Sequence, residues 1–472
     1  MRLIIEARIE GAAAASTPIK LGVIERQNEE LTLSNLGLRL DEGRELLRRT
    51  QQAAVSVQVA SWLAGRSACE SCHLPLAHKD IGTIVCRTTF GKVELASPRY
   101  LQCWCRTPVQ YRARPTFSPL ALALRQRVTG EFEQLQVEWA ARLPYRSAVR
   151  LLTQILPLDA GISFSGTRNR VRAVGLQLDR EDERAIETLP KARGPGIQSL
   201  SVTAVAVDSV WLKHCERKRT EGRQLNVVAG RATLAEGGTS LYGYVTRQVP
   251  SGAKRLDLFL SQQGVRPNER ATAITDGAVE FETAAAGSVL TGARILDWFH
   301  IAMKFRAAQM SAVMLSLRSP AQWRAIEHSI ERAKWLVWHG RAHKALERLR
   351  SVLETVKGMP EEDRSTLSLN VERVLNYLDQ NDRYLVPYAA RYRAGLAISS
   401  ATAESAVNEL VSARMAKRRQ MRWSEQGAHL LVQVRAAVLN GTLRPRERPV
   451  PWPAKARNDS RYRDYEWELE AA

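Results

Sequence analysis

Three apolar runs in the second half of the chain each end in an aspartate. They are VTAVAVDSV with Asp208, ATAITDG with Asp276 and ARILDWFH with Asp297. A buried strand delivers its C-terminal residue to the rim of the sheet, where open α/β sheets place their sites. Carboxylates repel one another unless a cation holds them together, and hard oxygen ligands select Mg²⁺ or Mn²⁺. The pattern therefore predicts an acidic metal site. The alternative is that each aspartate starts a turn or caps a helix.

A fourth acid, Glu404, stands in ATAESAVNELVSARM, where it shares one helical face with Val407 and Val411. An acid in line with an apolar stripe faces the core side and needs a partner there, which the aspartates would supply. The alternative is a glutamate that the helix dipole favours at a helix start. In a strongly basic chain, such an acidic cluster indicates phosphoryl chemistry on nucleic acid with two metal ions.

A second group of candidate ligands consists of cysteines. Cys69-x-x-Cys72 and Cys103-x-Cys105 stand on either side of a predicted β-hairpin. Tetrahedral zinc needs four soft ligands that converge from two directions, and such a small module depends on the metal for its folding. We therefore expect a structural zinc ribbon. The second pair is closer than the usual spacing, so three residues are alternative ligands: Cys86, His73 and His78. Buried cysteines without a metal are the other interpretation.

Composition narrows the class of protein. The 472 residues include 69 Lys and Arg against 49 Asp and Glu, a net charge of +20. Such a surplus favours a polyanionic partner, most commonly nucleic acid. No stretch approaches the roughly 18 apolar residues of a membrane-spanning helix. Glu6, Arg8 and Glu10 interrupt the start of the chain, where a signal peptide needs an apolar run, so we expect a cytoplasmic protein. Six cysteines are too few for a disulfide scaffold.

Periodicity predicts the elements that carry these groups. A strand at residues 3–9 precedes a helix at 41–63, and a hairpin at 81–97 turns at Phe90-Gly91. Short β-branched runs separated by helical windows predict an α/β region. Those runs are 201–207, 225–229, 239–246, 271–275 and 293–296. Residues 300–388 are helical almost throughout.

A helix-turn-helix is predicted before the α/β region. Residues 145–156 and 166–178 form two short helical patterns on either side of a turn. The second pattern carries Arg168, Arg170 and Arg172, which suit phosphates or guanine edges. The alternative is an ordinary pair of short helices in a helical domain.

Together these motifs resemble DDE transposases with a ribonuclease-H-like core, and most closely the ISKra4 family of bacterial insertion sequences. The resemblance spans residues 60–440 approximately. It rests on CESC…CWC, AVAVDSVWLKH, AITDG, ILDWFHIAMKF and TAESAVNELVSARMAKRRQMRWSEQGAHLL, in that order.

The resemblance implies a catalytic triad of Asp208, Asp276 and Glu404 that holds two Mg²⁺ (or Mn²⁺) ions per active site. It also implies that Asp297 and His300 form a supporting D-x-x-H element, the alternative being a histidine that packs at a helix start. One structural Zn²⁺ completes the expected cofactors. The sequence departs from the pattern before Glu404, where ISSATAE lacks the expected glycine and leaves the loop geometry open.

The resemblance also implies a multidomain α+β organisation. The expected parts are an N-terminal strand and helix (1–65), a zinc ribbon (66–112), a helix-turn-helix-like DNA-binding region (113–180), a linker (181–199), the first part of a ribonuclease-H-like core (200–300), an all-helical insertion (301–390), the last part of the core with Glu404 (391–442) and a basic C-terminal tail (443–472).

Basic residues after Glu404 are predicted to contact DNA phosphates. They are Arg414, Lys417, Arg418, Arg419 and Arg422. Trp423 is predicted to stack on an unpaired base. The alternatives are a solvated helix face and a core tryptophan. Recognition of specific DNA ends is assigned to the zinc ribbon and the helix with Arg168, Arg170 and Arg172.

By resemblance, the chain is expected to be a bacterial DNA transposase. It would bind the ends of its own insertion sequence, hydrolyse phosphodiesters with Mg²⁺ and join 3′-OH ends to target DNA. We expect a homodimer or larger assembly on double-stranded DNA, nucleoid-associated when bound and without a membrane partner. One alternative is a nuclease or resolvase on the same core without strand transfer. Another is a non-catalytic zinc-ribbon DNA-binding regulator.

Overall fold

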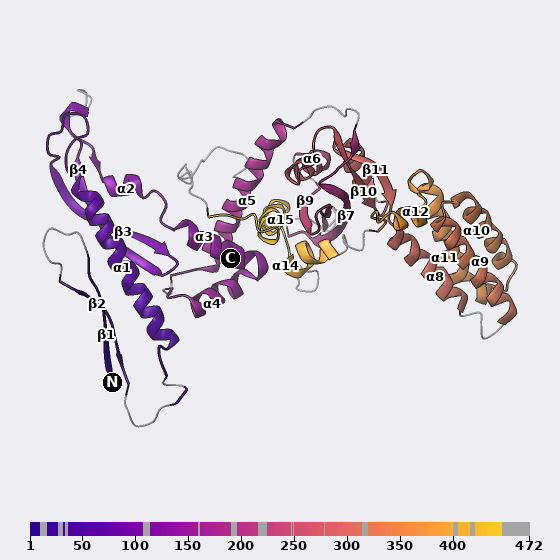
Figure 1. Ribbon diagram of the computed structural model, residues 1–472, viewed down its shortest axis with the longest axis horizontal. Helices are drawn as coiled ribbons and strands as arrows, with labels where there is room; N and C mark the ends of the chain where they lie inside the picture. The colour runs from indigo at the N-terminus through magenta and orange to yellow at the C-terminus, as the bar shows by residue number, and fades with distance from the viewer. Residues whose placement is uncertain are drawn as a thin grey trace. The chain divides into compact units, whose positions relative to one another are not determined.

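The computed structural model (Figure 1) describes residues 1–9, 17–26, 32–33, 36–106, 114–158, 161–189, 196–215, 224–246, 248, 250–277, 279–313, 320–399, 405–415 and 421–445, with the backbone alone for 279–282 and 361–365. The chain divides into two compact units. One comprises Met1–Arg170 and Arg444–Ala472, and the other comprises Val171–Leu443. Each unit is described by itself.

The first unit opens with an antiparallel pair, β1 (Arg2–Ala7) and β2 (Ile19–Glu25). The long helix α1 (Leu40–Ala64) packs against β2 and against β4. Its start is fixed by Glu42, whose carboxylate accepts the backbone N–H of Arg39 at 3.0 Å. A carboxylate in the first turn satisfies a free helix N–H group and complements the helix dipole. The predicted strand at 3–9 and helix at 41–63 both form.

A three-stranded sheet follows, built from β3 (His78–Thr88), β4 (Gly91–Leu101) and β5 (Thr116–Phe117). Side chains of β4 alternate between buried and exposed, which gives the sheet one apolar face. The apolar face packs against α1 and against α2 (Pro119–Ala123). The short helix η1 (Trp104–Arg106) follows β4 and carries Cys105.

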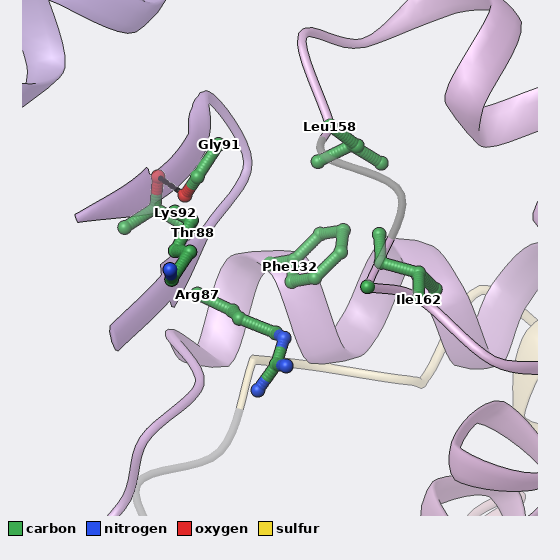
Figure 2. A pocket seen from close by; sticks show the side chains of 8 residues that line it. Arg87, Thr88, Gly91, Lys92, Phe132, Leu158 and Ile162 are labelled. Atoms are coloured by element: carbon green, nitrogen blue, oxygen red, sulfur yellow. Dashed lines mark hydrogen bonds between the residues drawn. The ribbon is translucent and has the colours of Figure 1, made fainter. Parts of the chain in front are cut away.

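The turn between β3 and β4 borders a cavity of about 330 Å³ (Figure 2). Gly91 has a φ of +108°, and the Thr88 hydroxyl donates to its carbonyl at 3.0 Å. The buried Phe132 ring lies beside Leu158 and Ile162 in this cavity, as Figure 2 shows. The glycine is required because φ is positive and an added Cβ would lie 2.8 Å from the Pro157 carbonyl.

The helices after this sheet are α3 (Gly130–Arg142), α4 (Tyr145–Ile155) and α5 (Phe164–Glu187). The second helix of the predicted helix-turn-helix is therefore not short, because α5 extends over 24 residues. The helix also includes residues 181–187, so this part of the predicted linker (181–199) is helical. Gln177 and Glu181, one turn apart, form a side-chain hydrogen bond that supports this extension. Residues 190–195 of the linker lie outside the described ranges.

The second unit is built on a mixed sheet of order β11-β10-β7-β8-β9. The strands are β7 (Val202–Lys213), β8 (Gln224–Leu234), β9 (Thr239–Val245), β10 (Glu269–Thr275) and β11 (Thr291–Leu296), and the short β6 (Ile197–Gln198) pairs with β10. The first three form an antiparallel meander, and β10 is parallel to both of its neighbours β7 and β11. Helices α6 (Gly252–Gln262) and α7 (Val279–Gly287) connect β9 to β10 and β10 to β11.

Apolar side chains cover both faces of this sheet. On one face, Val205 and Val207 pack with Tyr242 and with Phe259 of α6. On the other, Ala206 of β7 packs with Ile274 and Ile295. The second face also contacts the π-helical turn η4 (Asn408–Ser412) and α15 (Glu425–Leu439), which flank the short α14 (Ala413–Met415). Burial on both faces explains why β7 and β10 read as continuous apolar runs.

Helices fill the chain between β11 and η4. They are α8 (Trp298–Val313), α9 (Pro320–Trp338), α10 (Ala342–Lys357), α11 (Glu361–Gln380), η3 (Asp382–Tyr384) and α12 (Tyr388–Arg393). Figure 1 shows α8 to α11 packed as a bundle, with an apolar core of their own. None of the helices in the described ranges is long and apolar enough to cross a membrane. The chain is thus mixed α+β, with a separate bundle inserted beside the sheet.

Candidate functional site

Three aspartates occupy one row across three adjacent strands. Thr275 of β10 pairs with Val207 of β7 and with Leu296 of β11. The residues that follow these three are Asp208, Asp276 and Asp297. Side chains alternate along a strand, so the aspartates belong to the face on which Ala206, Ile274 and Ile295 pack. Neighbouring strands lie about 4.8 Å apart, so the carboxyl groups lie close together at the edge where β10 and β11 end. Strand β7 continues past Asp208 to Lys213, so Asp208 does not end its strand as the sequence predicts.

Asp297 is the buried member of this row and holds His300. Its Oδ2 lies 2.6 Å from His300 Nδ1, and its Oδ1 accepts the backbone N–H of Phe299 at 2.8 Å. The hydrogen bond to Asp297 raises the pKa of His300, and the charges of Asp276 and Asp208 act in the same direction while burial opposes them. The Asp297 carboxylate therefore begins α8 and orients the imidazole toward the acidic row.

Asp208 is half-buried and accepts the backbone N–H of Ser209 at 2.7 Å. Strand pairing places it in line with Ala229 of β8 and Gly243 of β9, on the same face of the sheet. A Cβ at Gly243 would lie only 2.7 Å from the Leu410 side chain, so η4 packs closely on this face. The segment that begins directly after Glu404 therefore covers the face that carries Asp208. Glu404 itself lies outside the described residues.

The helical bundle supplies residues at this edge that sequence reasoning missed. The Tyr377 hydroxyl donates to the backbone carbonyl of Asp276, and the Tyr388 hydroxyl donates to that of Leu296, both at 2.8 Å. Gly277 has a φ of +92°, and a Cβ there would lie 2.9 Å from Asn381 Oδ1. These contacts join positions about 100 residues apart, so no local pattern indicates them. The sequence indicates only that a buried tyrosine hydroxyl needs an acceptor, and it does not indicate which acceptor.

The aspartates present an open set of possible metal ligands. In the described part of the chain, the one group of three or more potential ligands whose ligand atoms all lie within 4.8 Å of one another is formed by cysteines. Asp297 uses both of its carboxylate oxygens on His300 and Phe299. Asp208 and Asp276 are half-buried acids on adjacent strands. Two such carboxylates suit a hard cation that takes further ligands from elsewhere.

Cys69, Cys72, Cys103 and Cys105 form the compact ligand group. The Sγ atoms of Cys69 and Cys105 lie 3.5 Å apart, and those of Cys72 and Cys103 lie 3.4 Å apart. Zinc–sulfur bonds of about 2.3 Å in a tetrahedron separate sulfurs by about 3.8 Å, so these positions fit a zinc ion closely. The cluster could therefore bind zinc, and all four thiols of this group are free of disulfides.

The backbone at the first cysteine pair forms a tight knuckle. The N–H of His73 donates to the Cys69 carbonyl at 2.9 Å, and His73 adopts a φ of +60°. Backbone N–H groups of Cys72 and Ser71 point at the Cys69 sulfur and lower the pKa of its thiol to about 6. Donors aimed at a thiolate favour the form that binds metal.

The alternative ligands lie outside this group. Cys86 is in the middle of β3, where burial raises the pKa of its thiol. His78 packs edge-on against the Tyr100 ring, with the ring centroids 5.8 Å apart. His73 serves the knuckle through its backbone. The compact group is thus the four-cysteine set expected from the sequence.

The arginines predicted on the second helix occupy different environments. Arg168 is half-buried, and Arg170 donates to Gln136 Oε1 at 2.7 Å. Arg172 is 8% exposed. The DNA contacts expected of these three side chains remain predictions, and the burial of Arg172 makes it the least suited to them.

The basic residues predicted after Glu404 also differ in exposure. Arg414 is 1% exposed, with its guanidinium 5.7 Å from the centre of the Trp423 ring, whereas Arg422 is exposed. Trp423 is half-buried, and its backbone pairs with the end of β7 at Lys213. Three predicted residues lie outside the described ranges: Lys417, Arg418 and Arg419. Arg422 is therefore the described member of this set best placed to reach a phosphate.

Comparisons with known proteins place little constraint on this site. No family model matches the chain, and no curated protein matches it. Among solved structures, the chain is similar to the Drosophila P element transposase strand transfer complex, with 9% sequence identity and a TM-score of 0.31. The similarity covers 69% of this chain and 96% of that chain. A TM-score this low leaves the site to be judged on its own geometry.

Proposed function

We propose that this chain is a DDE transposase whose second unit is a ribonuclease-H-like core. The strand order supports this proposal. An antiparallel meander of three strands, with two further parallel strands added beside the first, is the arrangement of that fold. The bundle between β11 and η4 then corresponds to an insertion between the second and third catalytic acids.

The observation that carries the proposal is the position of Asp208 and Asp276. They lie at neighbouring positions of two adjacent parallel strands, on one face of the sheet, where β10 ends and β7 continues. Placing two carboxylates side by side destabilises the fold unless a cation neutralises them. A purely structural role would not require this arrangement at a half-exposed edge.

The acids divide into two roles in this proposal. Asp208, Asp276 and Glu404 would hold Mg²⁺ or Mn²⁺, which supplies charge stabilisation and lowers the pKa of bound water when it is present. Asp297 orients His300, and both support the geometry of the edge. The reaction would hydrolyse a DNA phosphodiester and then join the free 3′-OH to a target strand.

The first unit would recognise DNA ends. Its four-cysteine group would hold one zinc ion and thereby fix the ends of the β3–β4 hairpin. The net charge of +20 favours a polyanion such as double-stranded DNA as the partner. Assembly on two DNA ends would need at least two copies of the chain. We assign the ISKra4 family as part of this proposal, on the motifs quoted above.

Cleavage of DNA in the presence of metal tests the proposal. The substrate is a labelled duplex that carries the DNA flanking the gene, incubated with Mg²⁺ or with a chelator. We expect the wild type to nick it only with Mg²⁺, and Asp208→Asn and Asp276→Asn to lose at least about 100-fold in rate, as removal of a metal ligand does. Glu236→Gln, on the exposed β8–β9 turn, is the matched control and should retain activity.

The same experiment separates the alternatives. Mg²⁺-dependent nicking without joined products would favour a nuclease or resolvase. DNA binding without cleavage in either Mg²⁺ or Mn²⁺ would contradict the enzymatic proposal and favour a regulator.

A further inference from the structure

A basic groove lies between α9 and α10, within the helical bundle and outside the acidic row. Its volume is about 460 Å³. Three cationic and three hydroxyl-bearing side chains line it: Arg332, Lys344, Arg348, Ser329, Ser351 and Thr355. Glu347 is the one carboxylate among the described lining residues, so positive charge is in excess. Cations and hydroxyl donors together are the groups that proteins use to bind phosphate.

The spacing of these residues makes the groove linear. Lys344, Arg348, Ser351 and Thr355 follow at helical intervals along one face of α10. Eleven residues of helix correspond to about 16 Å. The two helices form a hairpin around the turn at Gly340, so Arg332 of α9 comes level with Arg348 of α10.

The cations of the groove differ from their neighbours on the same hairpin. Lys334, Arg350 and Lys357 form ion pairs with Glu331, Asp379 and Glu354, at 4.0, 3.3 and 2.9 Å. Arg332, Lys344 and Arg348 form none with any described residue.

Arg348 shows the clearest need for a partner. Its Nε atom is buried, and no described group accepts a hydrogen bond from it. A buried donor without a partner is unfavourable, and an anion in the groove would supply an acceptor for it.

We propose that this groove binds the phosphodiester backbone of duplex DNA, an inference that rests on the proposed function. Successive phosphates of one strand advance about 3.4 Å along the duplex axis and lie farther apart along the winding backbone, so about 16 Å of groove spans about two or three of them. No aromatic side chain lines the groove in the described chain, and single-stranded binding depends on such stacking. The bundle thus provides a second contact with DNA, and this contact is independent of the base sequence.

The test compares two triple variants of the full-length protein that lose the same charge. Arg332→Gln, Lys344→Gln and Arg348→Gln remove the cations of the groove. Lys334→Gln, Arg350→Gln and Lys357→Gln remove the ion-paired cations outside it. Binding to a labelled duplex of arbitrary sequence is measured in chelator at several salt concentrations, and circular dichroism checks that both variants fold.

We expect the groove variant to bind about 10- to 100-fold more weakly at low salt. The slope of log K against log salt should decrease by about 2–3, since each phosphate contact contributes about 0.9. The control should change by less than about 3-fold. Equal slopes for wild type and the groove variant would overturn the inference. Inorganic pyrophosphate that displaces the duplex at equal phosphate concentration would also overturn it, in favour of a small-anion site.

The outcome is independent of whether the chain cuts DNA. If Asp208→Asn lacks cleavage and the groove variant binds duplex like wild type, the proposed function stands and the groove inference fails. If the wild type never cleaves and the groove variant alone loses binding, the groove inference stands for a DNA-binding protein.

Discussion

The hydroxyl of Tyr377 donates a hydrogen bond to the backbone carbonyl of Asp276, 101 residues earlier in the chain, at 2.8 Å. The ammonium group of Lys304, from the neighbouring helix α8, lies 4.4 Å from the centre of the Tyr377 ring. Tyr388 makes the equivalent bond to Leu296, the residue before Asp297. The helical bundle therefore holds the ends of β10 and β11, the strands that Asp276 and Asp297 directly follow. The position of these carboxyl groups thus depends on how the bundle packs.

Tyr377→Phe tests this link, because it removes the hydroxyl and retains the ring. Loss of one hydrogen bond to a partly buried carbonyl should lower the free energy of unfolding by about 1–2 kcal/mol. If the bond positions Asp276, the variant should also need a higher Mg²⁺ concentration for half-maximal DNA cleavage. Tyr392→Phe is the control, because that tyrosine is 67% exposed. If the variant is less stable but needs the same Mg²⁺ concentration as the wild type, Tyr377 has a structural role only.

Local patterns predicted most of the elements in the second unit. The runs ending at Asp208, Asp276 and Asp297 became β7, β10 and β11, because strands buried on both faces must be apolar throughout. The ends of strands were less predictable. Strand β7 continues to Lys213, six residues past the predicted end, because it pairs with β8 along its whole length.

Contacts between distant segments could not be predicted from periodicity. Tyr377 and Tyr388 look like ordinary helix residues in the sequence, and their role depends on how the bundle packs against the sheet. The length of α5 was missed because charged residues resembled a linker. Asp179, two residues before the predicted linker, is half-buried against its partners His429 and Arg255, which are 250 and 76 residues away.

His300 predicts a pH dependence of stability. Asp297, with Asp276 and Asp208, raises its pKa above the unfolded value of 6.5. The protonated imidazole therefore contributes stability that is fully present below about pH 6.5 and is lost as pH rises through the higher folded pKa. The difference in free energy of unfolding between wild type and His300→Gln should shrink over that window. Chemical denaturation in chelator between pH 5.5 and about 9 measures it. A constant difference would show that the charge of His300 adds nothing.

The four-cysteine group predicts one zinc ion per chain. Metal analysis of purified protein should find it, and Cys69→Ser or Cys103→Ser should lose it. Because structural zinc contributes folding energy, both variants should lose protection from hydrogen exchange around β3 and β4. Cys86→Ser and Cys215→Ser are matched controls outside the group and should retain zinc. Retention of zinc by the Cys69 and Cys103 variants would contradict this site.

A buried network in the second unit predicts a large loss of stability in Asp179→Asn. Asp179 accepts a hydrogen bond from Arg255 at 3.0 Å and lies 3.0 Å from His429 Nε2, which joins α5, α6 and α15. The Arg255 side chain is 4% exposed, so the substitution removes a hydrogen-bonded counter-ion from a buried charge. Breaking such a pair costs about 3–5 kcal/mol.

The exposed ion pair between Arg350 and Asp379 provides the comparison for that substitution. Both of its side chains are 57% exposed, and Asp379→Asn should cost less than about 1 kcal/mol. Denaturant unfolding of the two variants, at a pH near 7, measures both free energies under the same conditions. Similar losses for both would mean that Asp179 does not hold α5, α6 and α15 together, and that the packing of Leu430 against Gly175 fixes α5 instead.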